Sequence, residues 1–208
     1  EYFIKPTKNG LPSGWEEKTF EDSGIFERSK NRIKKFEGIK KYFDTSCIDR
    51  IHISKEPLFV SQNNIPSRAQ FIPEKNSVWF ARMSKTYKVL FFDKNSDFEV
   101  DNYVLSSGML GLKTKEEYFG FLCTLINSED FHNEKDSRAT GSTQVSLTDD
   151  GFNYITFIKP PVELIKKYSL IVNDYISEIL QLQKQNQNLQ KTRDILIPQL
   201  VGGRVEVK

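Results

Sequence analysis

The stretch from Val162 to Ile197, VELIKKYSLIVNDYISEILQLQKQNQNLQKTRDILI, decides the fold of this chain. Two rows of side chains recur along it at every seventh residue and interleave, which is the a/d pattern of a coiled coil. Pro160 and Pro161 precede the stretch and Pro198 follows it, so the sequence predicts one helix over 162–197. That helix would be about 54 Å long at ~1.5 Å per residue. The a row is Ile165, Val172, Ile179, Asn186 and Arg193, and the d row is Tyr168, Tyr175, Leu182, Leu189 and Leu196.

A partner helix is the expected neighbour of this seam. In the second half of the stretch the residues between the two rows are mostly Gln, Asn and Lys, so the apolar stripe is narrow. A helix that lies along a globular core normally shows a wider stripe. Asn186 and Arg193 place polar groups in the a row, where they cost stability but fix register and partner orientation. The alternative is a long surface helix that lies on its own domain.

The residues before this helix are enough for one domain with a real core. The chain holds 16 Phe, 8 Tyr and 2 Trp, which are large and rigid core formers. Strand-like runs cover 15–20, 42–44, 48–53, 78–83, 87–92, 98–105, 109–112 and 154–158, and a helical period covers 115–127. We therefore predict an α+β fold: a mostly β globular domain with short helices over 1–160, one long coiled-coil helix over 161–198, and a tail over 199–208.

Composition excludes several classes of function. The net charge is +2, so global charge indicates no partner. The 2 cysteines form no disulfide framework or metal cluster, which favours a reducing, cytoplasmic setting. No apolar run approaches ~18 residues and no signal peptide is present, so neither membrane nor secretion is implied. His52 and His132 lie far apart and the glycines are scattered, so we expect no enzyme, no metal and no cofactor. The chain begins at Glu1 rather than Met, and we expect a fragment or one half of a longer protein.

Polar loops carry the side-chain types that bind DNA. The basic segment near Arg28 fits phosphate contact, although a solvated charged loop is an equal alternative. Arg can bond guanine at two atoms, and Gln or Asn can do the same to adenine. Gln144, with Arg68 and Arg138, is a candidate base reader. The full set of candidates is Arg28, Lys30, Arg32, Arg68, Arg82, Lys85, Arg138, Ser142, Thr143 and Gln144.

Four motifs together resemble one half of a specificity subunit of a type I restriction–modification system. They span nearly the whole chain, and the segment that ends it is the most specific of them. The motifs are Leu11–Trp15, like the family's "LPxGW" entry to a recognition domain; 65–69 with 78–82, like its mid-domain pattern; Gly141–Gln144, like its "GSxQ" loop; and Pro160–Pro161, the heptad helix and 191–204, like its spacer helix and exit.

The resemblance implies a protein that binds double-stranded DNA and performs no chemistry. In that family the subunit reads two half-sites of a split sequence, and two antiparallel helices separate its recognition domains and dock the modification subunits, which recruit the restriction subunit. This chain has one domain and one helix, so it implies a homodimer or a second tandem half. Val162-Glu163-Leu164 also lacks the Glu-Gln pair that the family often shows. The alternative is a coiled-coil adaptor whose globular domain binds protein.

Overall fold

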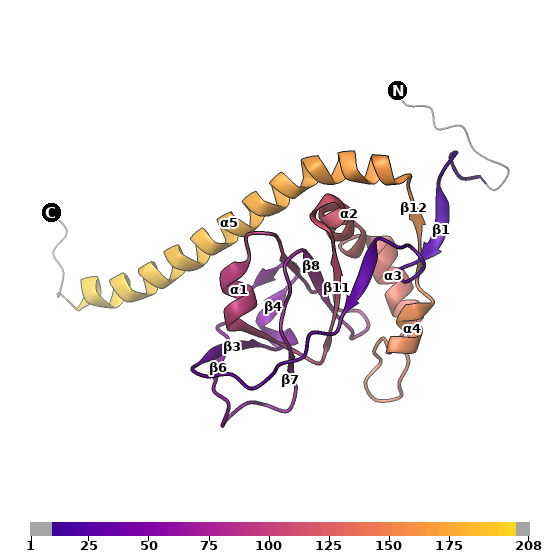
Figure 1. Ribbon diagram of the computed structural model, residues 1–208. Helices are drawn as coiled ribbons and strands as arrows, with labels where there is room; N and C mark the ends of the chain where they lie inside the picture. The colour runs from indigo at the N-terminus through magenta and orange to yellow at the C-terminus, as the bar shows by residue number, and fades with distance from the viewer. Residues whose placement is uncertain (1–9, 203–208) are drawn as a thin grey trace.

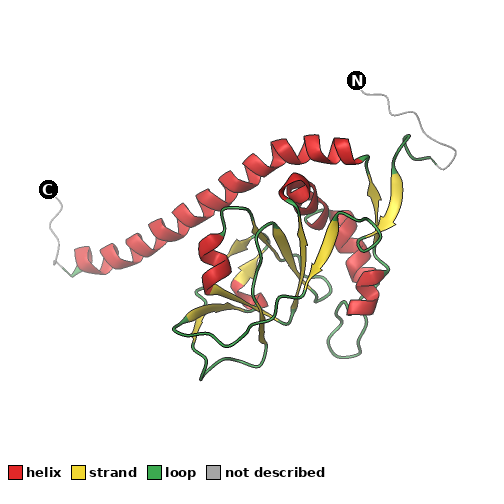
Figure 2. Ribbon diagram, viewed as in Figure 1, coloured by secondary structure: helices red, strands yellow, loops and turns green. Residues whose placement is uncertain are grey.

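The structure is a computed structural model that describes residues 10–202. The predicted tail and exit segment are therefore described only as far as Gly202. A globular domain built mostly of strands is followed by one long helix, α5 (Val162–Val201), which crosses one side of the domain and continues beyond it (Figure 1). The predicted α+β class, with short helices in the domain and a long helix after it, is confirmed (Figure 2).

An antiparallel sheet forms the centre of the domain. Strands β8 and β9 are buried along their whole length, and their continuous apolar runs suit a sheet that is covered on both faces. The predicted hairpin at 78–92 is confirmed, with Val78 opposite Phe91. In spatial order the strands are β2 (Phe26–Ser29), β11 (Met109–Thr114), β8 (Ser77–Ala81) and β9 (Val89–Phe92).

A second sheet lies beside the first and is mixed. Its central strands, β3 and β10, run parallel, and its outer strands pair antiparallel to them. A tight ladder of β4 (Ile48–Asp49) and β5 (His52–Ile53) turns at Arg50, whose φ is 49°. In spatial order the second sheet is β6 (Leu58–Val60), β3 (Lys40–Phe43), β10 (Tyr103–Ser106) and β7 (Ala69–Phe71).

One small ladder ties the start of the domain to the start of the long helix. Strand β1 (Glu16–Thr19) pairs antiparallel with β12 (Thr156–Lys159). Gly14 just before β1 has a φ of +79°, and a Cβ there would stand 3.1 Å from Cγ of Pro161. Glycine suits both the positive φ and this close approach. The glycine of the Leu11–Trp15 motif therefore meets the prolines that open α5.

Short helices cover the edges of the two sheets. The predicted helix over 115–127 is confirmed as α2. The strand predicted over 98–105 is wrong in its first part, because Asp97–Asn102 form a helical turn with Asp97 and Glu99 at its positive end. His132, for which the sequence analysis assigned no element, lies in a helix. The helices are α1 (Asp97–Asn102), α2 (Glu116–Ile126), α3 (Glu129–Ser137), α4 (Asp149–Asn153) and the 3-10 turn η1 (Thr45–Cys47).

The core has two main layers, one on each face of the first sheet. Val78 and Phe80 enter a cluster shared with α2 and α5, whereas Trp79 points the other way, toward the second sheet. A Cβ at Gly111 on the neighbouring strand would stand 2.6 Å from the Trp79 ring. Position 111 therefore accepts no larger residue without displacement of a fully buried indole.

Helix α5 combines the two alternatives that the sequence left open. Its first half lies on the domain, where Ser169 Oγ accepts from the Phe121 amide at 3.1 Å and Ser177 Oγ donates to Asp93 Oδ2 at 2.8 Å. Contacts with the domain continue as far as Lys191, which lies 3.8 Å from Glu56, and only the last turns extend beyond the domain (Figure 1). The predicted end at Ile197 is wrong, because Pro198 lies inside the last turn and the Gly202 amide bonds the Pro198 carbonyl at 3.0 Å. No helix within residues 10–202 has an apolar stretch long enough to cross a bilayer.

Candidate nucleic-acid interface

A basic groove of about 200 Å³ opens where the two sheets meet. Four of the predicted DNA-binding cations line it, together with Gln70, Ser107 and Asp149, which the sequence analysis did not single out. Two loops, 61–68 and 138–148, project from the domain on the side away from α5 (Figure 1). The four cations are Arg28, Lys30, Arg32 and Arg82.

The segment from Arg28 to Ile33 bridges the two sheets. Arg28 lies on β2 of the first sheet, whereas Arg32 makes a β-bridge to Phe71 of the second. The Ile33 amide donates to the Gln70 carbonyl at 2.9 Å. The backbone of this segment is thus bonded at both ends, while the side chains of Lys30 and Arg32 stay exposed, so phosphate contact and a solvated charged surface both remain open.

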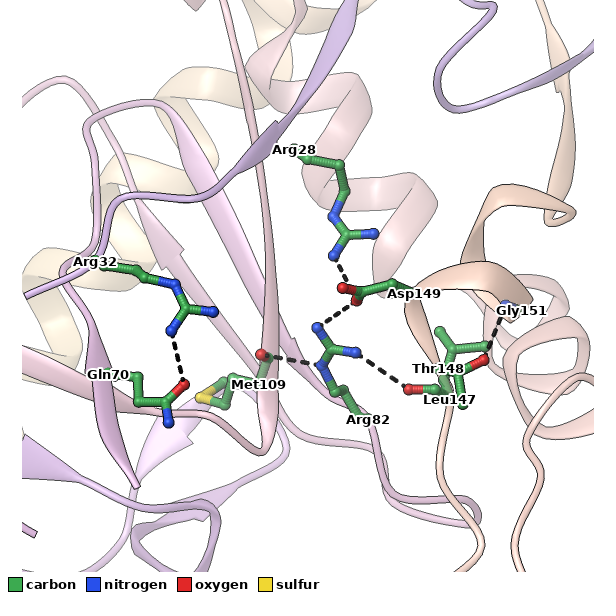
Figure 3. A network of polar contacts seen from close by, with 9 residues as sticks. All are labelled: Arg28, Arg32, Gln70, Arg82, Met109, Leu147, Thr148, Asp149 and Gly151. Carbon is green, nitrogen blue, oxygen red and sulfur yellow. Dashed lines mark hydrogen bonds and ion pairs between the residues drawn. The ribbon is translucent and has the colours of Figure 1, made fainter. Parts of the chain in front are cut away.

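Two arginines converge on one carboxylate at the end of the groove (Figure 3). Arg82 Nη2 lies 2.6 Å from Asp149 Oδ1, and Arg28 Nη2 lies 2.9 Å from the same oxygen. Burial alone raises the pKa of the Asp149 carboxyl, but hydrogen bonds and charge from the two guanidiniums outweigh that, so its pKa lies below the ordinary value. Asp149 begins α4, where Thr148 Oγ1 accepts from the Gly151 amide at 3.0 Å.

Arg28 and Arg82 differ in what remains free. Besides Asp149, Arg82 donates from Nε to the Met109 carbonyl at 3.4 Å and from Nη1 to the Leu147 carbonyl at 3.3 Å. All three of its nitrogens are thus engaged, and 19% of its side chain is exposed. Arg28 stacks over the Phe152 ring at 4.9 Å, and its Nε is buried without a hydrogen-bond partner within residues 10–202. Arg28 therefore bonds fewer groups than Arg82, although its Nε is not accessible to a ligand.

Arg32 and Gln70 form a polar pair on the groove wall (Figure 3). Arg32 Nη1 lies 3.5 Å from Gln70 Oε1, and its guanidinium stacks over Phe71 at 5.7 Å. Gln70 Nε2 donates to the Ser67 carbonyl at 3.2 Å, which fixes the orientation of the amide. The Gln70 amide keeps one further lone pair and one further N–H, the pattern that bonds adenine. The hydrophobic period of the sequence could not single out Gln70, because the strand on which it lies is too short to show a period.

The predicted loop residues gather around the tip of the β8–β9 hairpin. Met83 makes a β-bridge to Ser146, and the Ser84 amide donates to the Val145 carbonyl at 3.0 Å. At Gly141 the φ is 133°, and a Cβ would stand 2.4 Å from the Gln144 carbonyl oxygen, so the loop requires glycine there. The exposed side chains that this loop presents are Ser142, Thr143 and Gln144.

The other predicted readers lie close by with different surroundings. The Arg68 carbonyl accepts from the Ser107 amide at 2.8 Å, which places Arg68 at the turn that lines the groove. Lys85 has a φ of 55°, and its amide donates to Asp136 Oδ2 at 3.0 Å. Arg138 donates from Nε to Glu134 Oε1 at 2.6 Å, so its charge is paired within α3.

A buried lysine supports the hairpin tip from behind. Lys135 Nζ donates to the carbonyls of Met83 and Thr86 at 2.9 and 3.1 Å and lies 3.0 Å from Asp136 Oδ1. Burial lowers the pKa of Lys135. Burial, and then the charge of Lys135, lowers the pKa of His132 to about 4. This pair could not be found from the sequence, because α3 is polar almost throughout.

The predicted seam of α5 contains residues that are buried in the chain's own domain and residues that remain exposed. Ile165 is 1% exposed and belongs to the core of its own domain, so its assignment to a partner interface is wrong. Val172 packs partly against the same core. Leu164 and Ile171, one residue before each of these, are exposed instead. Ile179 is half-buried, and Asn186 and Arg193 are exposed, as are the d-row residues Tyr168, Tyr175, Leu182, Leu189 and Leu196.

Comparison with solved structures places the whole arrangement in a known fold. A chain from a structure of complex assembly and conformational transition in the type I R-M system matches with a TM-score of 0.61 and 18% identity over 95% of this chain. The HsdS subunit from Thermoanaerobacter tengcongensis matches with a TM-score of 0.57 and 20% identity over 90% of this chain. This chain spans 52% and 48% of those chains, or about half their length.

Sequence comparison adds no family. No protein-family model matches the sequence, and no curated protein matches it significantly. The structural matches alone show that the chain shares the fold of one half of an HsdS subunit.

Proposed function

We propose that this chain is a sequence-specific DNA-recognition module, one half of a type I restriction–modification specificity subunit. It binds one half of a bipartite site in double-stranded DNA, performs no chemistry, and docks modification subunits, and through them the restriction subunit, on α5. A second copy or a second tandem half pairs with α5. The observation that carries this proposal is a basic groove opposite a long helix with an exposed apolar seam, in a fold shared with HsdS.

The groove divides into positioning and reading contacts. Arg28, Lys30 and Arg32 follow one backbone segment, as side chains do that track a phosphate chain. Gln70 on the wall and Gln144 at the loop tip present amides that can bond adenine, and Arg68 beside them can bond guanine. Ser142, Thr143, Lys85 and Arg138 supply further contacts from the same side of the domain.

Salt-dependent binding to duplex DNA tests the proposal. The logarithm of the binding constant should fall linearly with the logarithm of salt concentration, with a slope of ~0.9 per phosphate contacted. Lys30→Ala and Arg32→Ala should each reduce that slope by about 1 and weaken binding to all duplexes alike. Gln144→Ala should cost about 1–3 kcal/mol on the preferred duplex and little on random DNA. Fluorescence anisotropy over a salt series measures all three.

The competing function is a coiled-coil adaptor whose domain binds protein. Leu58 and Phe59 on edge strand β6 are each 55% exposed, and an apolar edge strand can pair with a protein segment. Under that function the wild type would show no salt-dependent retention on duplex DNA, and Lys30→Ala would change nothing. A Leu58→Ser, Phe59→Ser variant should bind DNA normally if the domain is a DNA reader.

A further inference from the structure

Arg82 occupies a junction between the segments that carry the proposed base readers. Its amide donates to the Gly108 carbonyl at 2.9 Å, in the turn whose Ser107 amide bonds Arg68. Its carbonyl accepts from the Leu147 amide at 2.8 Å, at the end of the 138–148 loop. Its side chain repeats the connection, because the guanidinium bonds the carbonyls of Met109 and Leu147 and the carboxylate of Asp149.

The three acceptors of this guanidinium belong to two separate parts of the chain. Met109 begins β11, whereas Leu147 and Asp149 lie two residues apart, where the 138–148 loop runs into α4 (Figure 3). A planar guanidinium presents its donors in a fixed fork, so it holds its acceptors at set angles, whereas an ammonium does not. Replacement of the fork by an ammonium leaves the charge and the two backbone bonds of Arg82, but it removes the side-chain link that fixes the loop against the turn.

We propose that Arg82, with Asp149, is a positioning residue that sets the distance between Arg68 and the Ser142–Gln144 loop and so determines sequence discrimination. This inference rests on the proposed DNA-binding function and goes beyond it, because it removes Arg82 from the set of DNA contacts. Asp149 serves twice, since the same oxygen also holds Arg28 at the phosphate-binding end of the groove. Discrimination and backbone contact are thereby coupled through one carboxylate.

The charge-conserving variant Arg82→Lys separates positioning from phosphate contact. A lysine keeps the positive charge, so a phosphate contact would survive and the salt dependence would hardly change. It cannot bond three carbonyl and carboxylate acceptors in the arginine geometry. We expect the ratio of binding constants for a selected duplex over a scrambled duplex to fall about tenfold or more, with the salt slope unchanged within about 0.5.

Asp149→Asn gives an independent variant at an exposed carboxylate, which leaves the core untouched. It should lower the same ratio, and the double variant should lose less than the sum of the two single losses, because both variants break the Arg82–Asp149 contact. The selected duplex is one that the wild type recovers from a random-sequence pool. Retained binding to the scrambled duplex shows that each variant is folded, and Lys30→Ala, which lowers the salt slope, is the contrasting variant.

Two results would overturn the positioning role. One is an Arg82→Lys variant that discriminates as well as the wild type, and the other is a salt slope that falls with Arg82→Ala as it does with Lys30→Ala. Strictly additive losses in the double variant would also separate Arg82 from Asp149. A wild type that binds no duplex would instead overturn the proposed function, and this inference with it.

Discussion

At the scale of single residues, buried polar groups fix the geometry of the β8–β9 hairpin tip and of the loops proposed to contact DNA. Lys135 replaces water at two hairpin carbonyls, and Asp136 offsets part of the cost of burying its charge. His132 beside it makes an edge-to-face contact with Tyr87 at 4.5 Å between ring centroids. The hairpin tip therefore stands on a buried, partly charged support, and this support should make stability depend on pH.

His132 should make the protein less stable as the pH falls. Its pKa is about 4 in the folded protein and near 6.5 in the unfolded chain, so between these values the unfolded chain binds a proton that the folded protein does not. The free energy of unfolding should therefore decline from pH 6.5 toward pH 4, by at most about 3 kcal/mol. Denaturant unfolding of the wild type and His132→Phe at pH 7, 5.5 and 4 measures this difference. A constant difference between the two proteins across that range would contradict it.

Residue types were readable from the sequence, but their partners were not. The cluster of cations at Arg28, Lys30 and Arg32 could be seen in the sequence, because these residues alternate within one short segment. All three guanidinium nitrogens of Arg82 have acceptors, and one of these acceptors is Asp149. Because Asp149 is far from Arg82 in the sequence, no local pattern could reveal this contact. Gln70 became visible only when the second sheet placed it against Arg32.

At the scale of elements, the domain decides which stripe of α5 remains for a partner. The heptad pattern correctly predicted a long helix, and both rows of side chains lie on α5. A seven-residue pattern does not say which neighbour covers which row, however, and here the domain core takes Ile165 and part of Val172. The exposed stripe is the d row with Leu164 and Ile171 beside it. Pro198 misled the boundary: a proline lacks the amide hydrogen bond and crowds the carbonyl four residues before it, which normally ends or kinks a helix, yet α5 continues to Val201.

The exposed stripe should mediate antiparallel self-association. In a fully overlapped antiparallel pair of α5 helices, Leu182 lies near the two-fold axis, because it lies midway along Val162–Val201. Leu182→Cys should therefore form a disulfide with itself across the dimer, whereas Leu196→Cys should not. Cys47 and Cys123 are buried and provide the background. Non-reducing electrophoresis after mild oxidation measures both variants.

If the helices paired in parallel, both cysteine variants would form the intermolecular disulfide. If the protein were a monomer, neither variant would form it. A second variant removes the interface itself: Tyr175→Asp with Leu182→Asp should give monomers by light scattering that remain folded by circular dichroism, because both side chains are exposed in the single chain. Glu178→Asp, on the same helix, should remain dimeric. A wild type that is monomeric at micromolar concentration would contradict homodimerisation and leave pairing with a tandem half.

At the scale of the whole molecule, the domain and the helix form one stiff unit. Lys184 pairs with Glu99 at 2.9 Å, and Gln183 Nε2 donates to the Ile51 carbonyl at 3.1 Å, so contacts from two parts of the domain reach the middle of α5. The helix has 40 residues and is about 60 Å long. Because the domain overlaps the first half of the helix, two half-sites read by an antiparallel pair should be centred about 10 to 15 base pairs apart.

Selection from random duplexes with the purified chain and a modification subunit tests the central claim most directly. A two-fold dimer should recover an inverted repeat with an unread spacer of one fixed length. One base pair more would move a half-site by ~3.4 Å and rotate it by about a tenth of a turn, which a stiff helix pair should not absorb. The account predicts recovery of that split, symmetric site. Recovery of a single uninterrupted site, or of repeats with several spacer lengths, would contradict it.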